Sequence, residues 1–352
     1  MFVSRFPLRL LCLPPPPNIS TVAMRVCDLF AGLGGFTCGA LEAGANVVLA
    51  IDENPVPLKL LGLNAPLTTT VVATLGRDVV DLPPAAPDLH IHLSTPCTDL
   101  SMARKGRAQD LENNGLKMIR WAVELVLERK DSSWSLENVA TKATKAILSE
   151  LQAEYPERVA FALFDSADFG APQSRVRLIA GPKHLIRMLQ GIPCARRVSV
   201  RDAFAKHSLA PSAPFLKNQT RGSDGTPTIR TVETQSFTVC AGHGLTWCDA
   251  AGKSVHVMTA RDSAILMGYP LSWQLPKGSR ASQQAVGNGI CVALSKAIAL
   301  AAMAVLKGEA MVATIGQTEK RSIVFVSRSK HRSLRRRVDE LERMITSRDY
   351  RL

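Results

Sequence analysis

The sequence lacks the residue patterns that mark metal-binding, secreted and membrane proteins. Its eight cysteines are scattered through 352 residues and no two form a Cys-x-x-Cys pair, so no metal site is predicted. Scattered cysteines in a chain of this length are typical of a reducing, intracellular compartment. Uninterrupted apolar runs stay short of the ~18 residues that a membrane-spanning helix needs, so no membrane contact is expected.

Acidic residues are few relative to basic ones. The chain has 43 Lys and Arg against 30 Asp and Glu, which gives a formal net charge of +13. An excess of this size favours a polyanionic partner, with nucleic acid as the first candidate. Because 46% of the residues are hydrophobic, the chain also has enough apolar side chains for a substantial core.

The glycine-rich stretch DLFAGLGGF, residues 28–36, lacks the features of two common phosphate-binding turns. Thr37 stands where the Gly-x-Gly-x-x-Gly dinucleotide fingerprint has its third glycine, and there is no Gly-Lys-Ser/Thr for a P-loop. What remains is a tight turn after a strand. Asp52 ends the next strand, about twenty residues further on, where a carboxylate accepts hydrogen bonds from a ribose. A nucleoside-type ligand and a purely structural turn both fit this pattern.

Strand and helix patterns alternate from Arg25 to Gly181, which predicts an α/β fold with a doubly wound, mostly parallel sheet. The strand-like stretches are MRVCDLF, NVVLAID, LHIHLST, SWSLENV and RVRLIAG, and the helix-like ones include TCGALEAG and LKMIRWAVELVLERK. From Pro182 to Val257 the sequence is rich in Pro, Gly, Ser, Thr and Arg. That segment predicts a separate, loop-rich region.

Regular structure returns after residue 257. Thr259 and Asp262 have the spacing of a capping box, and Gly268 can end the helix that they begin. The stretch ICVALSKAIALAAMAVL predicts an apolar helix packed against the sheet. The tail from Gln317 onward is basic, with one short apolar stripe at helical spacing.

Polar residues that can carry chemistry lie at the ends of the later strands. Cys97 follows one strand directly after Pro96, and Glu137 ends the next. Arg175 and Arg177 alternate on one face of a third strand. Each of these features also has a purely structural interpretation. Cys97 could be a small buried core residue, Glu137 a carboxylate in a turn, and the arginines part of a solvent-exposed edge strand. Together, a thiol, a carboxylate, an arginine pair and a cofactor turn are the groups needed to methylate an electron-poor ring.

At this point the chain resembles the cytosine-5 DNA methyltransferase family from Arg25 to about Leu306. Six motifs occur in the family's order: DLFAGLGGF, PCTDLS, ENV, DFGAPQSRVR, MTARDSAILMGYP and QQAVGNGI. The resemblance implies a class I methyltransferase fold with a small inserted target-recognition domain. It also implies S-adenosylmethionine as the cofactor and double-stranded DNA as the partner.

The resemblance assigns a role to each matching residue. The cofactor-binding residues that it implies are Phe30, Gly32, Leu33, Gly34, Asp52, Glu53, Asp78, Pro96 and Asn288. It makes Cys97 the nucleophile that attacks carbon 6 of a flipped cytosine, and Glu137 the group at ring nitrogen 3. Arg175 and Arg177 are expected to hold the cytosine carbonyl oxygen and to brace Glu137.

Two positions depart from the family pattern. Thr98 stands where the family usually has Gln, and Ala140 follows Glu-Asn-Val where Pro is usual. The segment between the arginine strand and Met258 is also short for a recognition domain. A degenerate or short recognition sequence is therefore consistent with the chain.

The domain organisation follows from the same assignments. We expect a leader without a fixed fold at 1–23 (a targeting signal is the alternative), a catalytic and cofactor-binding domain at 24–182, a target-recognition region at 183–257, a return to the catalytic domain at 258–306 and a basic tail at 307–352. The protein is expected to act as a monomer at intracellular DNA, with a cognate restriction endonuclease as an open question.

Two other functions remain open from the sequence. One is a tRNA cytosine-5 methyltransferase of the same architecture, although the Cys-Phe-Thr variant motif of those enzymes is absent. The other is a non-catalytic DNA-binding homologue, for which Thr98 and Ala140 would be signs of decay.

Overall fold

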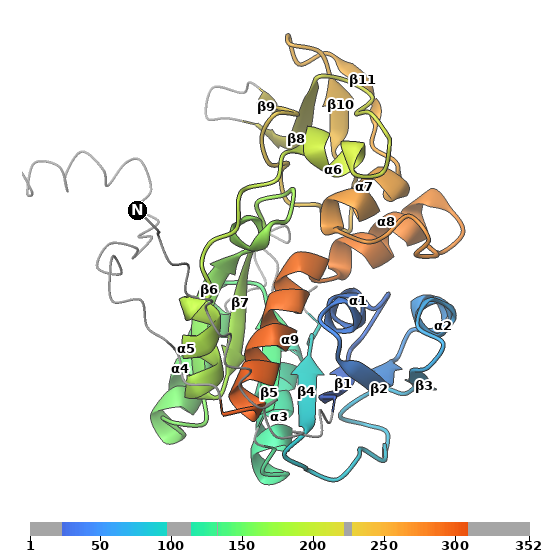
Figure 1. Cartoon of the computed structure of the whole chain (residues 1–352). Coiled ribbons are helices and arrows are strands. Elements are labelled where there is room, and N and C mark those ends of the chain that lie inside the picture. Colours follow the sequence, from blue (N-terminus) through green and yellow to red (C-terminus); the bar gives the residue numbers. More distant parts are fainter. Residues whose placement is uncertain (1–22, 97–113, 132, 222–226, 309–352) are drawn as a thin grey trace, which may run out of the picture. The chain divides into compact units, whose positions relative to one another are not determined.

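The computed structural model describes residues 23–96, 114–131, 133–221 and 227–308. Its main feature is a seven-stranded sheet in the order β3-β2-β1-β4-β5-β7-β6 (Figure 1). The strands are β1 (Arg25–Leu29), β2 (Asn46–Asp52), β3 (Thr69–Val72), β4 (Leu89–Leu93), β5 (Ser133–Asn138), β6 (Ala160–Asp165) and β7 (Val176–Gly181). Only β7 runs antiparallel to its neighbours in this sheet. The predicted doubly wound, mostly parallel α/β fold is confirmed.

Helices cover both faces of this sheet, and the alternation of side chains along each strand explains why. On one face lie α1 (Gly35–Glu42), α5 (Lys183–Gly191) and α9 (Val292–Leu306), which share a core with Val26 of β1 and Ile179 of β7. On the other face lie α3 (Asn114–Glu128) and α4 (Lys142–Glu154), which pack on Cys27 and Leu136. Central strands buried on both faces read as continuous apolar runs, as β1 does. The α2 helix (Pro55–Asn64) lies beside β2 and β3.

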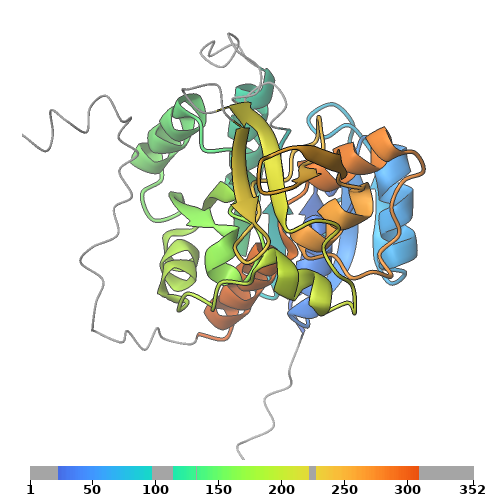
Figure 2. The same ribbon diagram turned by 90° about the horizontal axis from the view of Figure 1, so that it is seen from above.

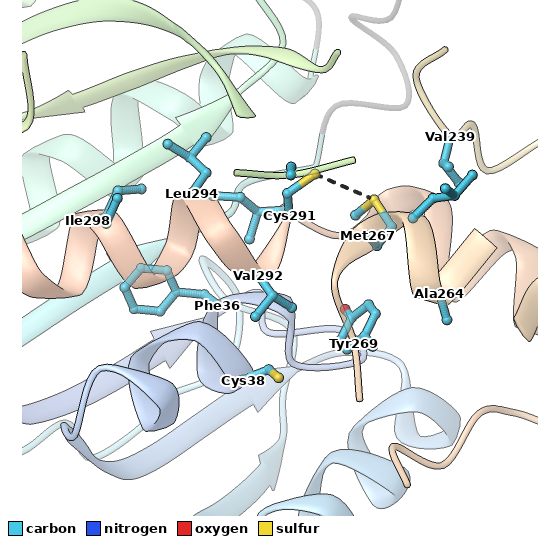
Figure 3. Close-up of a cluster of buried hydrophobic side chains, with 14 of the residues drawn as sticks. Phe36, Cys38, Val239, Ala264, Met267, Tyr269, Cys291, Val292, Leu294 and Ile298 are labelled. Atoms are coloured by element: carbon cyan, nitrogen blue, oxygen red, sulfur yellow. Dashed lines mark hydrogen bonds between the residues drawn. The ribbon is translucent and has the colours of Figure 1, made fainter. Parts of the chain in front are cut away.

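The last helix packs against the first, and small residues make this contact possible. A Cβ on Gly39 of α1 would lie 2.4 Å from Cβ of Ser295 in α9, and a Cβ on Gly35 would lie 2.6 Å from the Ile290 carbonyl. Figure 3 shows the core around this contact, where Phe36 faces the α9 residues and the Cys291 and Met267 sulfurs are 3.9 Å apart. The two helices therefore form one layer.

The helical stretch Ser279–Leu306 is long and apolar enough, by length and composition, to cross a membrane. It comprises α8 (Ser279–Asn288) and α9, and the extended backbone of Gly289 marks the end of α8. Much of α9 is buried against the sheet and α1. A buried, apolar helix of this kind is typical of the interior of a globular domain, as the sequence predicts.

A second, smaller sheet lies at one end of the main sheet (Figures 1 and 2). It has four antiparallel strands in the order β11-β10-β8-β9. These are β8 (Phe215–Arg221), β9 (Pro227–Thr231), β10 (Thr246–Cys248) and β11 (Ser254–Val257), flanked by α6 (Val200–Ala205) and α7 (Ala260–Met267). The predicted capping box of α7 is present, with Thr259 and Asp262 bonding each other's backbone N–H.

The chain leaves the main sheet later than the sequence predicts. We expect the inserted region to begin at 183, whereas residues 183–191 form α5, which packs against α9, β6 and β7. The apolar face of α5, with Leu185, Ile186 and Leu189 buried, requires this position. The segment that builds the small sheet therefore begins after Gly191.

Candidate active site

The turn between β1 and α1 is built by main-chain hydrogen bonds. Ala31 N–H donates to the Ile51 carbonyl at 2.9 Å, and Gly34 N–H donates to the Ala31 carbonyl at 2.8 Å. Phe30, Gly32 and Gly34 have φ angles of 62°, 53° and 84°. Glycine adopts such left-handed values without steric cost, so the two glycines are needed here for conformation.

The two glycines differ in what surrounds them. A Cβ on Gly34 would lie 2.9 Å from the Leu61 side chain, whereas one on Gly32 would meet nothing within 4 Å. Gly32 thus borders open space at the carboxyl end of β1, which is where ligands bind in open α/β sheets. Leu33 is buried, and its carbonyl accepts a hydrogen bond from Trp273 Nε1 at 3.1 Å.

Asp52 closes the turn from the neighbouring strand. Its Oδ2 accepts from Gly32 N–H and its Oδ1 from Asn54 N–H, both at 2.8 Å. Burial raises its pKa, and these two hydrogen bonds oppose that effect. Each carboxylate oxygen keeps a further lone pair for a ribose hydroxyl. Glu53 beside it is exposed.

Asp28, in the strand that leads into this turn, is a residue that the sequence patterns did not single out. It is fully buried in β1, and its Oδ2 accepts from the Thr37 N–H at 3.1 Å and from the Thr37 hydroxyl at 2.6 Å. Its Oδ1 has no partner among the described residues. Burial raises the pKa of Asp28 to about 7. The sequence does contain a pattern that could have identified Asp28, namely an acidic residue inside an apolar strand that leads into a glycine turn.

These features fit the cofactor that the resemblance implies. An unpartnered buried carboxylate oxygen, a ribose-type acceptor and open space at Gly32 suit a nucleoside ligand that carries positive charge. The other predicted cofactor residues lie at the surface: Asp78, whose carboxylate accepts from Thr74 N–H at 2.6 Å, Pro96, and Asn288 at the end of α8. The role of each in cofactor binding stays a prediction.

A buried ion pair lies at the carboxyl end of β5. Arg177 Nε is 2.9 Å from Glu137 Oε1, and the two side chains are only 12% and 9% exposed. At this burial the pair is shielded from solvent screening, so it holds the carboxylate more firmly than a surface pair would. Two arginines were expected near this carboxylate, and the structure brings Arg177 to it.

Asn138, the next residue, anchors the neighbouring strand end. Its Nδ2 donates to the Thr95 carbonyl at 3.0 Å and to the Thr95 hydroxyl at 2.9 Å. Its Oδ1 accepts from Val139 N–H at 2.7 Å. Thr95 is followed by Pro96 and Cys97. Cys97 and Thr98 lie outside the described residues. The structure therefore shows the strand end that leads to Cys97 and not the position of its thiol.

The turn after β5 is ordered despite Ala140. Thr141 N–H donates to the Val139 carbonyl at 3.0 Å, and the Thr141 side chain caps α4. The capping hydroxyl therefore fixes a turn for which the family usually uses Pro.

Arg175 has different partners from Arg177. Its guanidinium donates to the carbonyls of Val239, Gly287 and Gly289 at 2.7, 3.0 and 2.8 Å, and the residue is 2% exposed. A Cβ on Gly287 would lie 2.4 Å from the Cys240 and Ala241 backbone, so only glycine allows this approach. Arg175 therefore joins the start of β7 to the α8–α9 junction and to the segment between β9 and β10.

A cavity of about 320 Å³ lies beside the small sheet, lined by residues of that sheet, of the segment between β9 and β10, and by Ser174 just before β7. Ser174, Arg230, Thr238 and His243 are among the residues that line it. Arg230 stacks over the Phe237 ring at 4.3 Å from its centroid and donates to the Ser236 carbonyl at 2.9 Å. The lining is polar and includes the Arg230 guanidinium, which suits part of an anionic substrate.

The strand order, the glycine turn and the buried carboxylate at the end of β5 define an α/β protein of the class I methyltransferase type. Residues 24–185 match the family model for C-5 cytosine-specific DNA methylase. This match confirms the resemblance seen in the sequence.

Curated relatives support this assignment. M.HgiDI, a Type II methyltransferase of Herpetosiphon aurantiacus, is 25% identical over 303 residues, which cover 80% of this chain and 95% of that protein. M.XorII, a Type II methyltransferase of Xanthomonas oryzae pv. oryzae, is 28% identical over 217 residues, or 54% of this chain. The match spans 47% of M.XorII, about half of its length.

Solved structures share the fold. An E. coli prophage protein assigned as a DNA modification methyltransferase superposes with a TM-score of 0.58 at 17% identity, covering 82% of this chain and 100% of that one. The Dnmt2 methyltransferase of S. pombe gives a TM-score of 0.51 at 16% identity, with coverage of 81% and 99%. At these identities the likeness supports the architecture alone.

Proposed function

We propose that this protein is a DNA (cytosine-5-)-methyltransferase that uses S-adenosylmethionine. The observation that carries the proposal is the buried Glu137–Arg177 pair, joined through Asn138 to the strand end that leads into Pro96 and Cys97. Parallel strands bring their carboxyl ends to one edge, so these groups share that edge with the glycine turn. The proposal includes action on double-stranded DNA, as a monomer, inside the cell.

Residues of the turn would hold the cofactor. Asp52 would accept from the ribose hydroxyls, and the unpartnered Oδ1 of Asp28 would accept from a donor on the cofactor or on a water beside it. Gly32 lets the ligand approach the main chain. When bound, S-adenosylmethionine supplies an electrophilic methyl group.

The protein residues would make the target ring reactive. The Cys97 thiolate would attack carbon 6 of an extruded cytosine, forming a sulfur–carbon bond and raising the electron density at carbon 5. Glu137 would give a proton or hydrogen bond to nitrogen 3, so that little negative charge builds up on the ring. After transfer of the methyl group, a base removes the carbon 5 proton and the bond to Cys97 breaks.

The two arginines would have separate tasks in this reaction. Arg177 braces Glu137 through its Nε, whereas the Arg175 guanidinium is engaged with three main-chain carbonyls. We therefore infer that Arg177 holds the Glu137 carboxylate in place. Arg175 instead holds the segment between β9 and β10 against the large sheet. The cavity beside the small sheet, with Arg230 in its lining, would contact the DNA next to the extruded base.

The test measures transfer of labelled methyl groups from S-adenosylmethionine to mixed-sequence duplex DNA and to tRNA. We expect incorporation into DNA that exceeds incorporation into tRNA. Covalent trapping on DNA that contains 5-fluorocytosine should occur with the unaltered protein and disappear in Cys97→Ala. Greater incorporation into tRNA would favour the RNA alternative. Salt-sensitive DNA binding without any transfer would identify a binding protein instead.

A further inference from the structure

Two histidines and three serines form a buried polar ladder across β4 and β5, and neither the family motifs nor the proposed mechanism uses it. His90 and His92 are fully buried on β4. In the sheet register His90 lies opposite Ser133, and His92 opposite Ser135. Side chains at alternate positions share one face of a strand, so all of these groups point to the same face of the sheet.

Four hydrogen bonds join the ladder end to end. Ser133 Oγ is 2.7 Å from His90 Nδ1, and His90 Nε2 is 2.9 Å from Ser135 Oγ. Ser135 Oγ is also 2.8 Å from His92 Nδ1, and His92 Nε2 is 2.9 Å from Ser94 Oγ. The chain of contacts thus runs from Ser133 to Ser94, three residues before Cys97.

Counting protons limits this ladder to two arrangements. Burial lowers the pKa of His90 to about 3 and that of His92 well below its usual range, so both rings are neutral. A neutral imidazole has one donor and one acceptor nitrogen, and a hydroxyl has one proton. Ser135 therefore donates to one ring and accepts from the other. Every bond in the ladder must then point toward Ser94, or every bond must point toward Ser133.

The two ends of the ladder differ in burial. Ser133 is 2% exposed, whereas Ser94 is only half-buried. If the bonds pointed toward Ser133, its hydroxyl proton would be left at the buried end, where the described residues offer it no other acceptor. A buried donor without an acceptor is costly. If the bonds point toward Ser94, the spare proton lies at the open end and can reach water or a ligand.

The ladder also contacts the two elements on either side of the glycine turn, β1 and α1. The Phe36 ring, two residues after Gly34, stacks on the His92 ring with centroids 3.5 Å apart and planes 4° apart. Ser94 N–H donates to the carbonyl of Leu29, the last residue of β1, at 3.0 Å. Asn138 holds the next residue, Thr95. The strand end before Pro96 is therefore fixed by β1, by β5 and by the ladder.

We propose that the His–Ser ladder is a hydrogen-bond chain of fixed direction, with both imidazoles in the Nε2–H tautomer, and that it makes His92 and Ser94 positioning residues for the segment that carries Pro96 and Cys97. The ladder sets the orientation of the Ser94 side chain, and the rigid strand end then fixes where the Pro-Cys segment begins. The positioning role rests on the proposed function, whereas the direction of the chain does not.

The direction is tested on the full-length protein labelled with ¹⁵N in its histidine rings. The two buried rings are identified by their proton contacts to Phe36, and long-range ¹H–¹⁵N correlation reports which nitrogen carries the proton. We expect Nε2–H at both rings, unchanged from pH 5 to pH 8. An Nδ1–H tautomer at either ring, or a ring that titrates in this range, would overturn the proposal.

The positioning role is tested with matched variants at the two ends of the ladder. Ser94→Ala and Ser133→Ala each remove one hydroxyl and one hydrogen bond. We expect Ser94→Ala to lower kcat by about tenfold to a hundredfold, because small misplacements of a reacting group have effects of this size. KM for S-adenosylmethionine should stay within about twofold. Ser133→Ala should keep kcat, and Ser94→Thr should restore it.

Equal losses of kcat in the two alanine variants would show a general structural role and overturn the proposal, as would full activity of Ser94→Ala or failure of Ser94→Thr to restore kcat. Melting temperatures of the two alanine variants check that both proteins fold. If the unaltered protein transfers no methyl group, the proposed function fails, and the tautomer measurement still decides the direction of the ladder.

Discussion

The two halves of the candidate site are built in different ways. In the turn half, around Gly32 and Gly34, the shape comes from left-handed backbone and main-chain hydrogen bonds. In the strand-end half, it comes from buried side chains, with Glu137 paired to Arg177 and Arg175 fixed on carbonyls. Substitutions should therefore change chemistry in the strand-end half and change backbone geometry in the turn half.

Glu137→Gln gives the sharpest contrast between the halves. It keeps the shape of the side chain but removes the group that would supply the proton, so we expect methyl transfer to fall ~10²- to 10⁴-fold. S-adenosylmethionine binding, measured by calorimetry, should change little because the turn is intact. A parallel loss of cofactor affinity would contradict the separation of the two halves.

Arg175→Met tests whether the two arginines differ as their contacts indicate. It leaves three buried carbonyls without the donor that now satisfies them, so we expect a loss of ~3–5 kcal/mol in the free energy of unfolding. The matched variant Arg177→Met should lower the transfer rate more and stability less, because the Glu137 carboxyl that it leaves unpaired can take up a proton, whereas the three carbonyls that Arg175 leaves have no such remedy. Urea denaturation and single-turnover kinetics measure the two effects, and equal stability losses would refute the assignment.

Gly34→Ala tests the backbone requirement of the turn half. A side chain there would be strained at φ 84° and crowded at 2.9 Å from Leu61, so we expect a loss of ~2–4 kcal/mol. Gly44→Ala is the control, since Gly44 has a similar φ of 86° but open space around it. Its loss should be ~1–2 kcal/mol. Thermal denaturation compares the two, and the difference between them isolates the crowding.

The buried carboxyl group of Asp28 predicts a pH effect in the turn half. Its pKa is raised to about 7 in the folded protein, so between about pH 4 and pH 7 the folded state holds a proton that the unfolded state has lost. This group therefore contributes stability that falls as pH rises through that window. Relative to the unaltered protein, Asp28→Asn should gain roughly 1 kcal/mol per pH unit in that window.

Urea denaturation at several pH values measures this difference. The two buried histidines have lowered pKa values and act in the opposite direction, with stability rising as pH increases toward their ordinary pKa of about 6.5. They are present in both proteins, so their effect cancels in the comparison. A difference that does not change with pH would mean that Asp28 is ionised throughout.

The sequence was informative wherever a local pattern determines structure. The glycine turn, the alternating strands and the capping box at Thr259 all follow from neighbouring residues, and the structure contains each of them. Glu137 also lies where the pattern predicts, at the end of a short apolar strand, while its role stays a prediction.

Other features depend on partners distant in the chain, which local patterns do not reveal. Arg175 and Arg177 look alike in the sequence, and they differ because Val239, Gly287 and Gly289 come from segments 64 to 114 residues later. The His–Ser ladder depends on the register between β4 and β5. The position of α5 depends on α9, which follows it by about a hundred residues.

The close fit of Gly39 against Ser295 has a consequence for how the protein is made. The ribosome synthesises α1 early, but α9, against which α1 packs, is synthesised about 250 residues later. During translation the N-terminal apolar face of α1 therefore stays uncovered until nearly three hundred residues have left the ribosome. A nascent chain interrupted before α9 would expose that face to chaperones and proteases.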